Sequence, residues 1–219
     1  MISLLFLQEY FPLFLKGLFV SLQIAFYSCF IGAMFGLLFG VIISQKIKII
    51  YKIVKLYVVV IRGTPMLIQI TATYYLFAYA GLSISSFWSA VFSIGLNSAA
   101  YVSQIVVAGI NAVGVGQIEA AKVLGFNRTQ IILFIIFPQM IRVVLPTLGN
   151  ELVTLIKDSS LASTIGVYEL SKQGSIIACH TYNIPAVYLI MGAIYLVVTS
   201  FVSGIISLLE KRMQYYVTR

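Results

Sequence analysis

The sequence is poor in the residues that catalytic and metal sites require. Of its 219 residues, 14 are Lys or Arg, 6 are Asp or Glu and 1 is His, so charged residues make up only 9%. A soluble domain usually carries about 25% charged residues, because its surface must be polar. This scarcity excludes a soluble enzyme and a disordered chain. With His180 as the only histidine, two-histidine haem ligation within the chain is excluded, and we predict no catalytic or metal-ligating residue.

Cysteine and phosphate-binding loops are equally scarce. Cys29 and Cys179 are too few for a disulfide framework and lack the spacing of metal ligands. No G-x-x-x-x-G-K-[ST] loop occurs, so the chain has no phosphate-binding loop of that type. We therefore do not expect this chain to be an enzyme.

Apolar residues, in contrast, dominate the chain, with a hydrophobic fraction of 61% and a mean hydropathy of +1.04. This composition predicts an all-α polytopic membrane protein. A spanning helix needs roughly 20 mostly apolar residues, and the runs of that length predict about five of them. We place them near residues 17–43, 64–81, 88–112, 137–157 and 184–209. The second has an alternative, earlier start within 56–61.

Basic residues cluster in alternate connections, and this sets the expected orientation. Lys and Arg concentrate on the cytoplasmic side of membrane proteins, so the net charge of +8 indicates topology rather than nucleic-acid binding. They fill the first and third connections and the C-terminal tail: Lys46, Lys48, Lys52, Lys55, Arg62, Lys122, Arg128, Arg142, Lys211, Arg212 and Arg219. The N-terminus is therefore predicted outside and the C-terminus in the cytoplasm. The first basic residue, Lys16, comes too late for a cleaved signal peptide.

Small residues recur at every fourth position of the first predicted span. They are Ser28, Gly32, Gly36, Gly40 and Ser44. This spacing lets another helix backbone approach closely. The partner is either a helix of the same chain or a second subunit.

Polar residues share one face in each of the third and fourth predicted spans. The third carries Ser93, Asn97, Tyr101, Gln104 and Asn111, and the fourth carries Thr147, Glu151, Thr154 and Asp158. Polar groups avoid lipid, so both faces point inward or at a cavity. They either line a substrate path or hydrogen-bond between helices, and Glu151 alternatively forms a structural salt bridge or a cap. Our candidate path residues are Asn97, Tyr101, Gln104 and Glu151.

The third connection, at about 114–135, has the pattern of two short helices. Residues 117–125 predict the first, with Glu119 near its positive end and Gly125 at its stop. Asn127 and Gln130 then fit a capping box that starts the second. Ala120 and Ala121 leave one face small enough to press against a partner. A plain amphipathic connector is the alternative.

The same segment, Glu119-Ala-Ala-x-x-x-Gly125, resembles the EAA motif of permease subunits of ATP-binding-cassette importers. Further blocks agree in order across about residues 15–210: Arg62-Gly-Thr-Pro65, Leu96-Asn-Ser-Ala-Ala-Tyr101, Phe137-Pro-Gln139, Leu148-Gly-Asn-Glu151, Lys157-Asp-Ser-Ser-Leu-Ala-Ser163 and Gly166-Val-x-Glu-Leu170. Together they resemble the polar amino acid uptake branch, whose substrates are of the histidine, glutamine and arginine type. One departure is that Gln104, Val107 and Ala108 replace an acidic residue, a basic residue and a glycine. This subunit would then contribute less to substrate or partner contacts, pair with a more typical subunit, or move a different substrate.

The resemblance implies one permease domain over 1–219, with the MetI-like fold of type I importers, in a bacterial inner membrane. Two permease subunits, alike or homologous, would form the path. A cytoplasmic ATPase dimer, holding ATP and Mg²⁺, would bind at Gln117, Glu119, Ala120, Ala121 and Gly125. A periplasmic or lipid-anchored binding protein would deliver the amino acid, and no cofactor or nucleic acid is expected on this chain. Two other functions stay open: a non-conducting membrane anchor or assembly subunit, and a small transporter independent of ATP.

Overall fold

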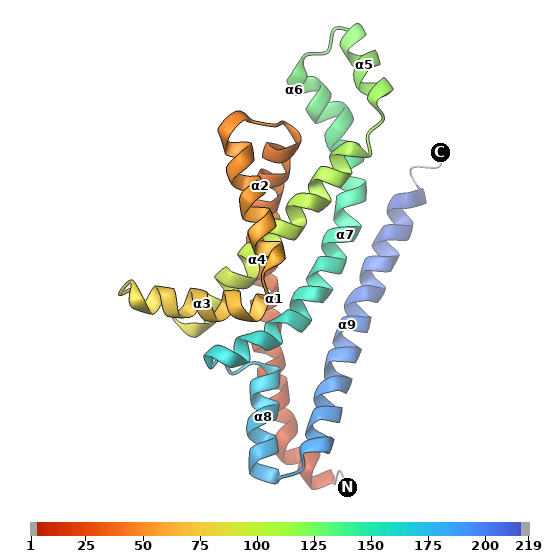
Figure 1. Cartoon of the computed structure of the whole chain (residues 1–219). Helices are drawn as coiled ribbons and strands as arrows, with labels where there is room; N and C mark the ends of the chain where they lie inside the picture. Colours follow the sequence, from red (N-terminus) through yellow and green to blue (C-terminus); the bar gives the residue numbers. More distant parts are fainter. Residues whose placement is uncertain (1–3, 216–219) are drawn as a thin grey trace.

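The computed structural model describes residues 4–215, and Figure 1 shows them as a bundle of long helices. The chain runs along the bundle in α1, returns in α2, and alternates in this way through α4, α7 and α9 (Figure 1). The elements are α1 (Leu4–Ser44), α2 (Lys48–Gly63), α3 (Met66–Tyr79), α4 (Ser86–Asn111), α5 (Val115–Val123), α6 (Arg128–Ile131), the π turn η1 (Ile132–Ile136), α7 (Phe137–Asp158), the 3₁₀ segment η2 (Ser159–Ile165), α8 (Leu170–Thr181) and α9 (Ile184–Tyr215). The first turn of α1 and the last turn of α9 lie at opposite ends of the bundle.

Between residues 4 and 215, four helical segments are long and apolar enough to cross a membrane, and α2 with α3 forms a bent fifth candidate. Within the described residues every element is a helix, which confirms the predicted all-α class. The predicted spans at 17–43, 88–112, 137–157 and 184–209 correspond to α1, α4, α7 and α9. The first is longer than predicted, since the 41 residues of α1 extend roughly 62 Å at 1.5 Å per residue, about twice the hydrocarbon core of a bilayer.

The second predicted span differs from the structure. The sequence predicts one helix over 64–81, with an alternative start within 56–61, but the structure has two helices here: α3, with 14 residues, meets α2 at 112°. Pro65 explains the break, because its ring disfavours a helical Thr64, which adopts φ −119° and ψ 146°. The basic connection that precedes it is itself the helix α2, with Val54 and Val58 buried on its inner face. The second pass along the bundle is therefore α2, and α3 lies across its end (Figure 1).

The small-residue stripe of α1 packs against α4 of the same chain. A Cβ built on Gly36 would lie only 2.5 Å from the Cβ of Val102, so only glycine permits this approach. Ser28 Oγ donates a hydrogen bond of 3.2 Å to the carbonyl of Val91. Of the two partners that the sequence left open, the structure therefore supports the helix of the same chain.

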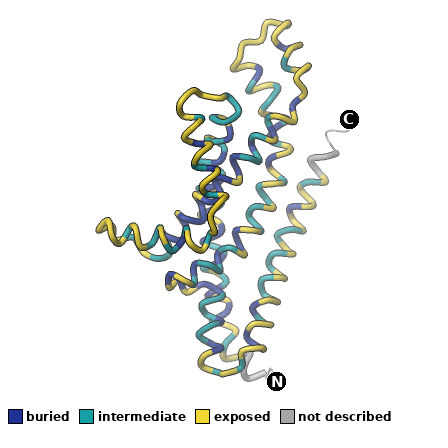
Figure 2. Tube along the Cα trace, in the orientation of Figure 1, coloured by how far each residue is buried: buried dark blue, intermediate teal, exposed yellow. Residues whose placement is uncertain are grey.

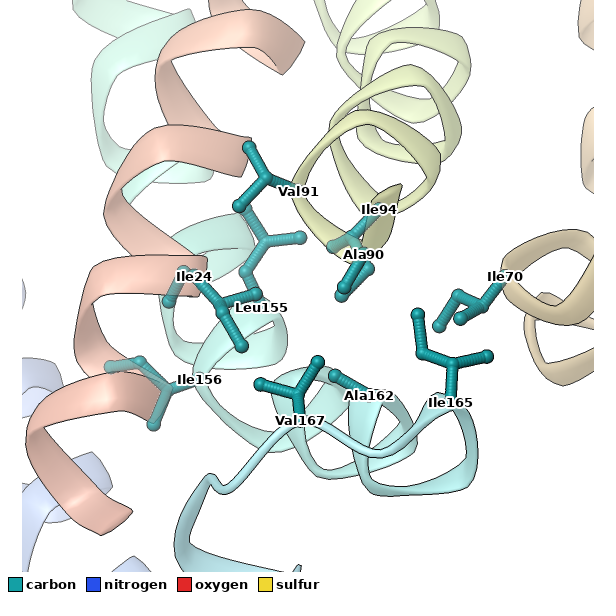
Figure 3. Close-up of a cluster of buried hydrophobic side chains, with 11 residues drawn as sticks. Ile24, Ile70, Ala90, Val91, Ile94, Leu155, Ile156, Ala162, Ile165 and Val167 are labelled. Carbon is teal, nitrogen blue, oxygen red and sulfur yellow. The ribbon is translucent and has the colours of Figure 1, made fainter. Parts of the chain in front are cut away.

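A cluster of buried side chains joins five elements (Figure 3). Its members include Ile24 from α1, Ile70 from α3, Ile94 from α4, Leu155 from α7 and Ile165 from η2. In lipid the gain from such packing comes from close van der Waals contact rather than from removal of water. The cluster holds the transverse helix α3 against the long helices.

Large apolar side chains cover the outside of the bundle. On α9, Leu196, Val197 and Phe201 are 66%, 67% and 69% exposed. Figure 2 shows α9 largely exposed, whereas α4 is buried along much of its length. Because these side chains lie on a helix long enough to span a bilayer, they are suited to contact with lipid.

Glu169 is fully buried and connects three helices just before α8, outside the candidate spans. It accepts hydrogen bonds of 2.8 Å from the backbone N–H groups of Ser171 and Lys172. The hydroxyls of Ser21 on α1 and Tyr195 on α9 each donate to it at 3.2 Å. Burial raises the pKa of Glu169, and these hydrogen bonds act in the opposite direction. The carboxyl group thus caps α8 and holds it against α1 and α9.

Candidate functional site

A hollow of about 350 Å³ opens between the end of α2 and the facing sides of α4 and α7. Its walls combine two charges with neutral polar and apolar groups, among them Arg62, Tyr101, Gln104, Val143, Thr147 and Glu151. A hollow of this size suits a small molecule. Among residues 4–215, no three His, Cys, Asp or Glu side chains gather as a metal site would require.

The two charged residues of this hollow do not neutralise each other. Glu151 Oε1 accepts a hydrogen bond of 2.7 Å from Ser98 Oγ. The guanidinium carbon of Arg62 lies 5.1 Å from the centre of the Tyr101 ring. In the part of the chain that the structure describes, no ion pair joins Arg62 to Glu151. Both groups therefore keep hydrogen-bonding capacity for a ligand that carries a carboxylate and an ammonium group.

The hollow brings together three of the four candidate path residues: Tyr101, Gln104 and Glu151. Asn97 lies elsewhere, because its Nδ2 donates a hydrogen bond of 2.8 Å to Gln69 Oε1 on α3. Gln69 in turn donates to the carbonyl of Ile61 at 2.7 Å. Through these hydrogen bonds Asn97 links α4 to the bend between α2 and α3. This agrees with the alternative that the polar residues form hydrogen bonds between helices.

Two polar lining residues, Arg62 and Thr147, are absent from the candidate path residues. The sequence assigns Arg62 to a cytoplasmic connection, whereas α2 carries it to the hollow. The sequence feature that could have identified Arg62 is its position directly before Gly-Thr-Pro, which breaks the helix, and at the start of a long run without charged residues. Thr147 has a simpler signal, since it precedes Glu151 by one helical turn on the same face.

A second hollow continues the first toward the end of α4. It has a volume of about 180 Å³, shares Val143 with the first and is lined by Gly109, Gln139 and Arg142. Both hollows lie between α4 and α7. The two hollows meet at Val143, with Glu151 beside the first and Arg142 beside the second.

The predicted pair of short helices is present between α4 and α7. After α5, Gly125 adopts φ +82°, in the left-handed region that glycine reaches without steric cost. Asn127 Oδ1 accepts a hydrogen bond of 2.9 Å from the N–H of Gln130, and Gln130 Oε1 accepts one of 2.8 Å from the N–H of Asn127. This complete capping box confirms the predicted start of the second short helix.

The helix α5 presents a mixed surface at one end of the bundle (Figure 2). Glu119 and Ala120 are exposed, whereas Ala121 is buried. Val123 and Leu124 at its end are 87% and 76% exposed. Apolar side chains this exposed beyond the ends of long helices favour contact with another protein.

Two side-chain contacts join this helix pair to the rest of the bundle. Gln139 Nε2 on α7 donates a hydrogen bond of 2.6 Å to Gln117 Oε1 on α5. Arg128 on α6 donates to Gln45, just after α1. The exposed helix α5 is thus connected to the same helix that carries Arg142 and Glu151.

Comparison with known proteins decides the family. Residues 32–215 match the model of the family described as "Binding-protein-dependent transport system inner membrane component". The chain belongs to this family. Members are membrane components of transport systems, so the chain is a transport subunit and not an enzyme.

Individual relatives agree with this family. The "Probable amino-acid ABC transporter permease protein YckA" of Bacillus subtilis (strain 168) is 37% identical over 209 residues, which cover 95% of this chain and 92% of the relative. A crystal structure of an amino acid ABC transporter with histidines matches with a TM-score of 0.91 at 38% identity, over 97% of this chain and 99% of that chain. The inward-facing MetNI methionine ABC transporter shares the fold, with a TM-score of 0.78 at 19% identity over 97% and 99% of the two chains. The predicted resemblance to importer permeases and the predicted permease fold are confirmed.

Proposed function

We propose that this chain is the membrane-spanning permease subunit of an ATP-driven amino acid importer in the bacterial inner membrane. The amino acid transporters among its relatives support the substrate class, and the family description supports delivery by a binding protein. The expected partners are a second permease subunit, a cytoplasmic ATPase dimer and a periplasmic or lipid-anchored amino acid binding protein. ATP and Mg²⁺ would bind to the ATPase. The second permease is a copy of this chain or a homologue.

The hollow between α2, α4 and α7 is the substrate site in this proposal. Arg62 would bind the α-carboxylate and Glu151 the α-ammonium group, each through charge-assisted hydrogen bonds. Tyr101 and Gln104 would leave a neutral polar space for the side chain. The observation that carries the proposal is one hollow faced by a cation and a carboxylate that are not paired with each other. A non-conducting anchor has no need of such a hollow.

The docking site for the ATPase is the exposed helix α5 with the turn that follows it. Of the residues predicted for this role, Gln117, Glu119, Ala120 and Gly125 are exposed, whereas Ala121 is buried in this chain and would position α5 rather than contact the ATPase. The exposure of Glu119, Val123 and Leu124 supports this role.

The orientation of the chain follows from the end of the bundle at which α5 lies. The turn between α1 and α2, the helix α5 and the end of α9 lie at the same end (Figure 1). Lys46, Lys122 and Lys211 belong to these segments, so the positive-inside rule makes this end cytoplasmic. Arg219 and the side chain of Arg212 lie outside the described residues.

The mechanism we propose is alternating access. ATP binding closes the ATPase dimer, which moves the docked α5 helices together. The contact between Gln117 and Gln139 passes this movement to α7, so the bundles rock and the hollow opens outward. ATP hydrolysis and product release restore the inward-open state.

Co-purification with native partners tests this proposal. The affinity-tagged chain, expressed at its native level, is expected to retain an ATPase and a binding protein whose ligand is identified by mass spectrometry. In proteoliposomes, the loaded binding protein is expected to stimulate ATP hydrolysis. No stimulation would favour a membrane anchor, and uptake that survives loss of the ATPase would favour an ATP-independent transporter. Labelling of α5 from outside the cell would reverse the orientation and remove the docking role.

A further inference from the structure

A basic stripe runs along one face of α2 and ends at the hollow. Lys48, Lys52, Lys55, Val59 and Arg62 follow one another at alternating steps of four and three residues, which places them on one side of a helix. At 1.5 Å per residue, the stripe from Lys48 to Arg62 is roughly 21 Å long. It therefore extends from the turn between α1 and α2 to the wall of the hollow.

The basic stripe is separate from the packed face and from the lipid-facing face of α2. The packed face contains Val54 and Val58, each 6% exposed. On the side of the basic stripe away from Val54 and Val58 lies an apolar stripe with the same alternating steps. Its residues are Ile49 (74% exposed), Ile53 (63%), Leu56 (64%) and Val60 (51%). Since α2 already has an apolar face for lipid, the lysines lie at the border between that face and the bundle.

No acidic side chain of the described residues forms an ion pair with the stripe. The sequence has no Asp or Glu between Glu9 and Glu119. Lys55 Nζ lies 5.7 Å from the centre of the Tyr51 ring. Charged residues within membrane-spanning segments face a water-filled cavity or the bundle interior, because lipid cannot solvate them. Arg62, at the inner end of the stripe, already faces the hollow.

We infer that this basic stripe lines the aqueous cytoplasmic half of the path, and that this chain passes amino acids with uncharged or acidic side chains and rejects those with cationic side chains. The inference rests on the proposed function of the hollow. Glu151, the one carboxylate there, is needed for the α-ammonium group, and Gln104 is neutral. A cationic side chain would find no further carboxylate and would meet three lysines on the way out, whereas a carboxylate is attracted by the same potential.

Two adjacent cysteine substitutions test where the stripe lies. Val59 on the stripe is 61% exposed and Val60 on the lipid-facing side is 51% exposed, so Val59→Cys and Val60→Cys form a matched pair. They are made in the complete importer, with Cys29 and Cys179 replaced by serine. We expect water-soluble methanethiosulfonates to modify Val59→Cys at least tenfold faster than Val60→Cys. We also expect the anionic sulfonatoethyl reagent to modify Val59→Cys faster than the cationic trimethylammonium-ethyl reagent. Equal rates at the two positions, or no preference for the anionic reagent, would overturn the inference.

Equilibrium binding tests the substrate class. Labelled L-glutamine, L-glutamate and L-arginine are added to the permease–ATPase complex in phosphatidylcholine vesicles, without the binding protein. We expect L-arginine to bind at least tenfold more weakly than L-glutamine. The triple variant Lys48→Gln/Lys52→Gln/Lys55→Gln should reduce this ratio several-fold, and Lys→Arg replacements at the same three positions should preserve it. The triple variant Lys16→Gln/Lys172→Gln/Lys211→Gln removes the same charge elsewhere and should leave the ratio unchanged.

The outcomes separate this inference from the proposed function. If the wild-type complex binds none of the three amino acids, the proposed substrate site fails and the inference fails with it. If it binds all three with equal affinity, or if the Lys→Gln stripe variant keeps the wild-type ratio, the site stands and only the inference fails. If the Lys→Gln stripe variant changes the affinity ratio only in vesicles of anionic lipid, the lysines face lipid headgroups. This result also overturns the inference.

Discussion

Gln139 Nε2 lies 2.6 Å from Gln117 Oε1 and also donates a hydrogen bond of 2.9 Å to the carbonyl of Ile135. Gln139 follows Pro138, which has no N–H to donate, and the π turn η1 comes just before it. One side chain therefore stabilises a distorted helix start and binds the exposed helix α5. Since Gln139 also lines the second hollow, it connects the proposed docking site to the proposed path.

Loss of this hydrogen bond should uncouple ATP hydrolysis from uptake. Gln117→Ala and Gln139→Ala are each expected to lower the amount of amino acid taken up per ATP hydrolysed in proteoliposomes. Because both variants lose the same bond, the double variant should be little worse than either single one, with a coupling energy of about 0.5–1.5 kcal/mol. Gln173→Ala on α8 is the control. Fully additive losses would show that the contact does not transmit the movement.

The turn after α5 should tolerate only glycine without loss of ATPase binding. An L-residue in the left-handed region costs roughly 1–2 kcal/mol, and asparagine is tolerated better than a β-branched residue. Gly125→Val is therefore expected to weaken ATPase binding roughly five- to thirty-fold, and Gly125→Asn to weaken it less. The measurement is the affinity of the detergent-solubilised permease for its ATPase. Gly116→Ala, inside α5 with open space around it, is the matched control. Wild-type affinity of the Gly125→Val variant would contradict the docking role.

The close approach of α1 and α4 predicts a stability defect that a second substitution repairs. In Gly36→Ala the new Cβ would lie 2.5 Å from the Cβ of Val102, so the two helices must separate. Overpacking of this kind costs about 1–3 kcal/mol and should lower the Tm of the purified complex. The double variant Gly36→Ala/Val102→Gly places the larger side chain on α1 and the smaller one on α4, and it should restore part of the lost Tm. Gly204→Ala on α9, where an added Cβ would meet no neighbouring atom within 4 Å, should not lower the Tm, because alanine is the better helix former.

The features that could be predicted from the sequence are those that neighbouring residues determine. The capping box of Asn127 and Gln130 and the left-handed turn at Gly125 depend on residues within one or two helical turns. The helix α2 was missed because its lysines lower its hydropathy. The spacing of Val54 and Val58 on its buried face is the signal of an amphipathic helix.

The candidate site was predicted in part for a related reason. Asn97, Tyr101 and Gln104 share one face of α4, and this periodicity is visible in the sequence. Which neighbour each residue meets depends on the bend between α2 and α3, because this bend brings Gln69 to Asn97 and Arg62 to Tyr101. Pro65 is the sequence signal of this break, but the predicted spans do not include a break there, and the sequence does not give the direction that the chain takes after it.

The two unpaired charges of the hollow give the sharpest test of the substrate site. Glu151→Gln keeps an acceptor for Ser98 Oγ but removes the charge that would bind an ammonium group. Hydrogen bonds to charged groups are worth roughly 1.5–3 kcal/mol, so the Kd of the amino acid should rise about ten- to a hundredfold. Ser98→Ala keeps the carboxylate and should change the Kd by no more than about threefold, because it loses one neutral donor. Asn97→Leu should lower the Tm more than the affinity, since Asn97 supports the bend and does not line the hollow. Unchanged affinity in Glu151→Gln would remove this residue from the substrate site.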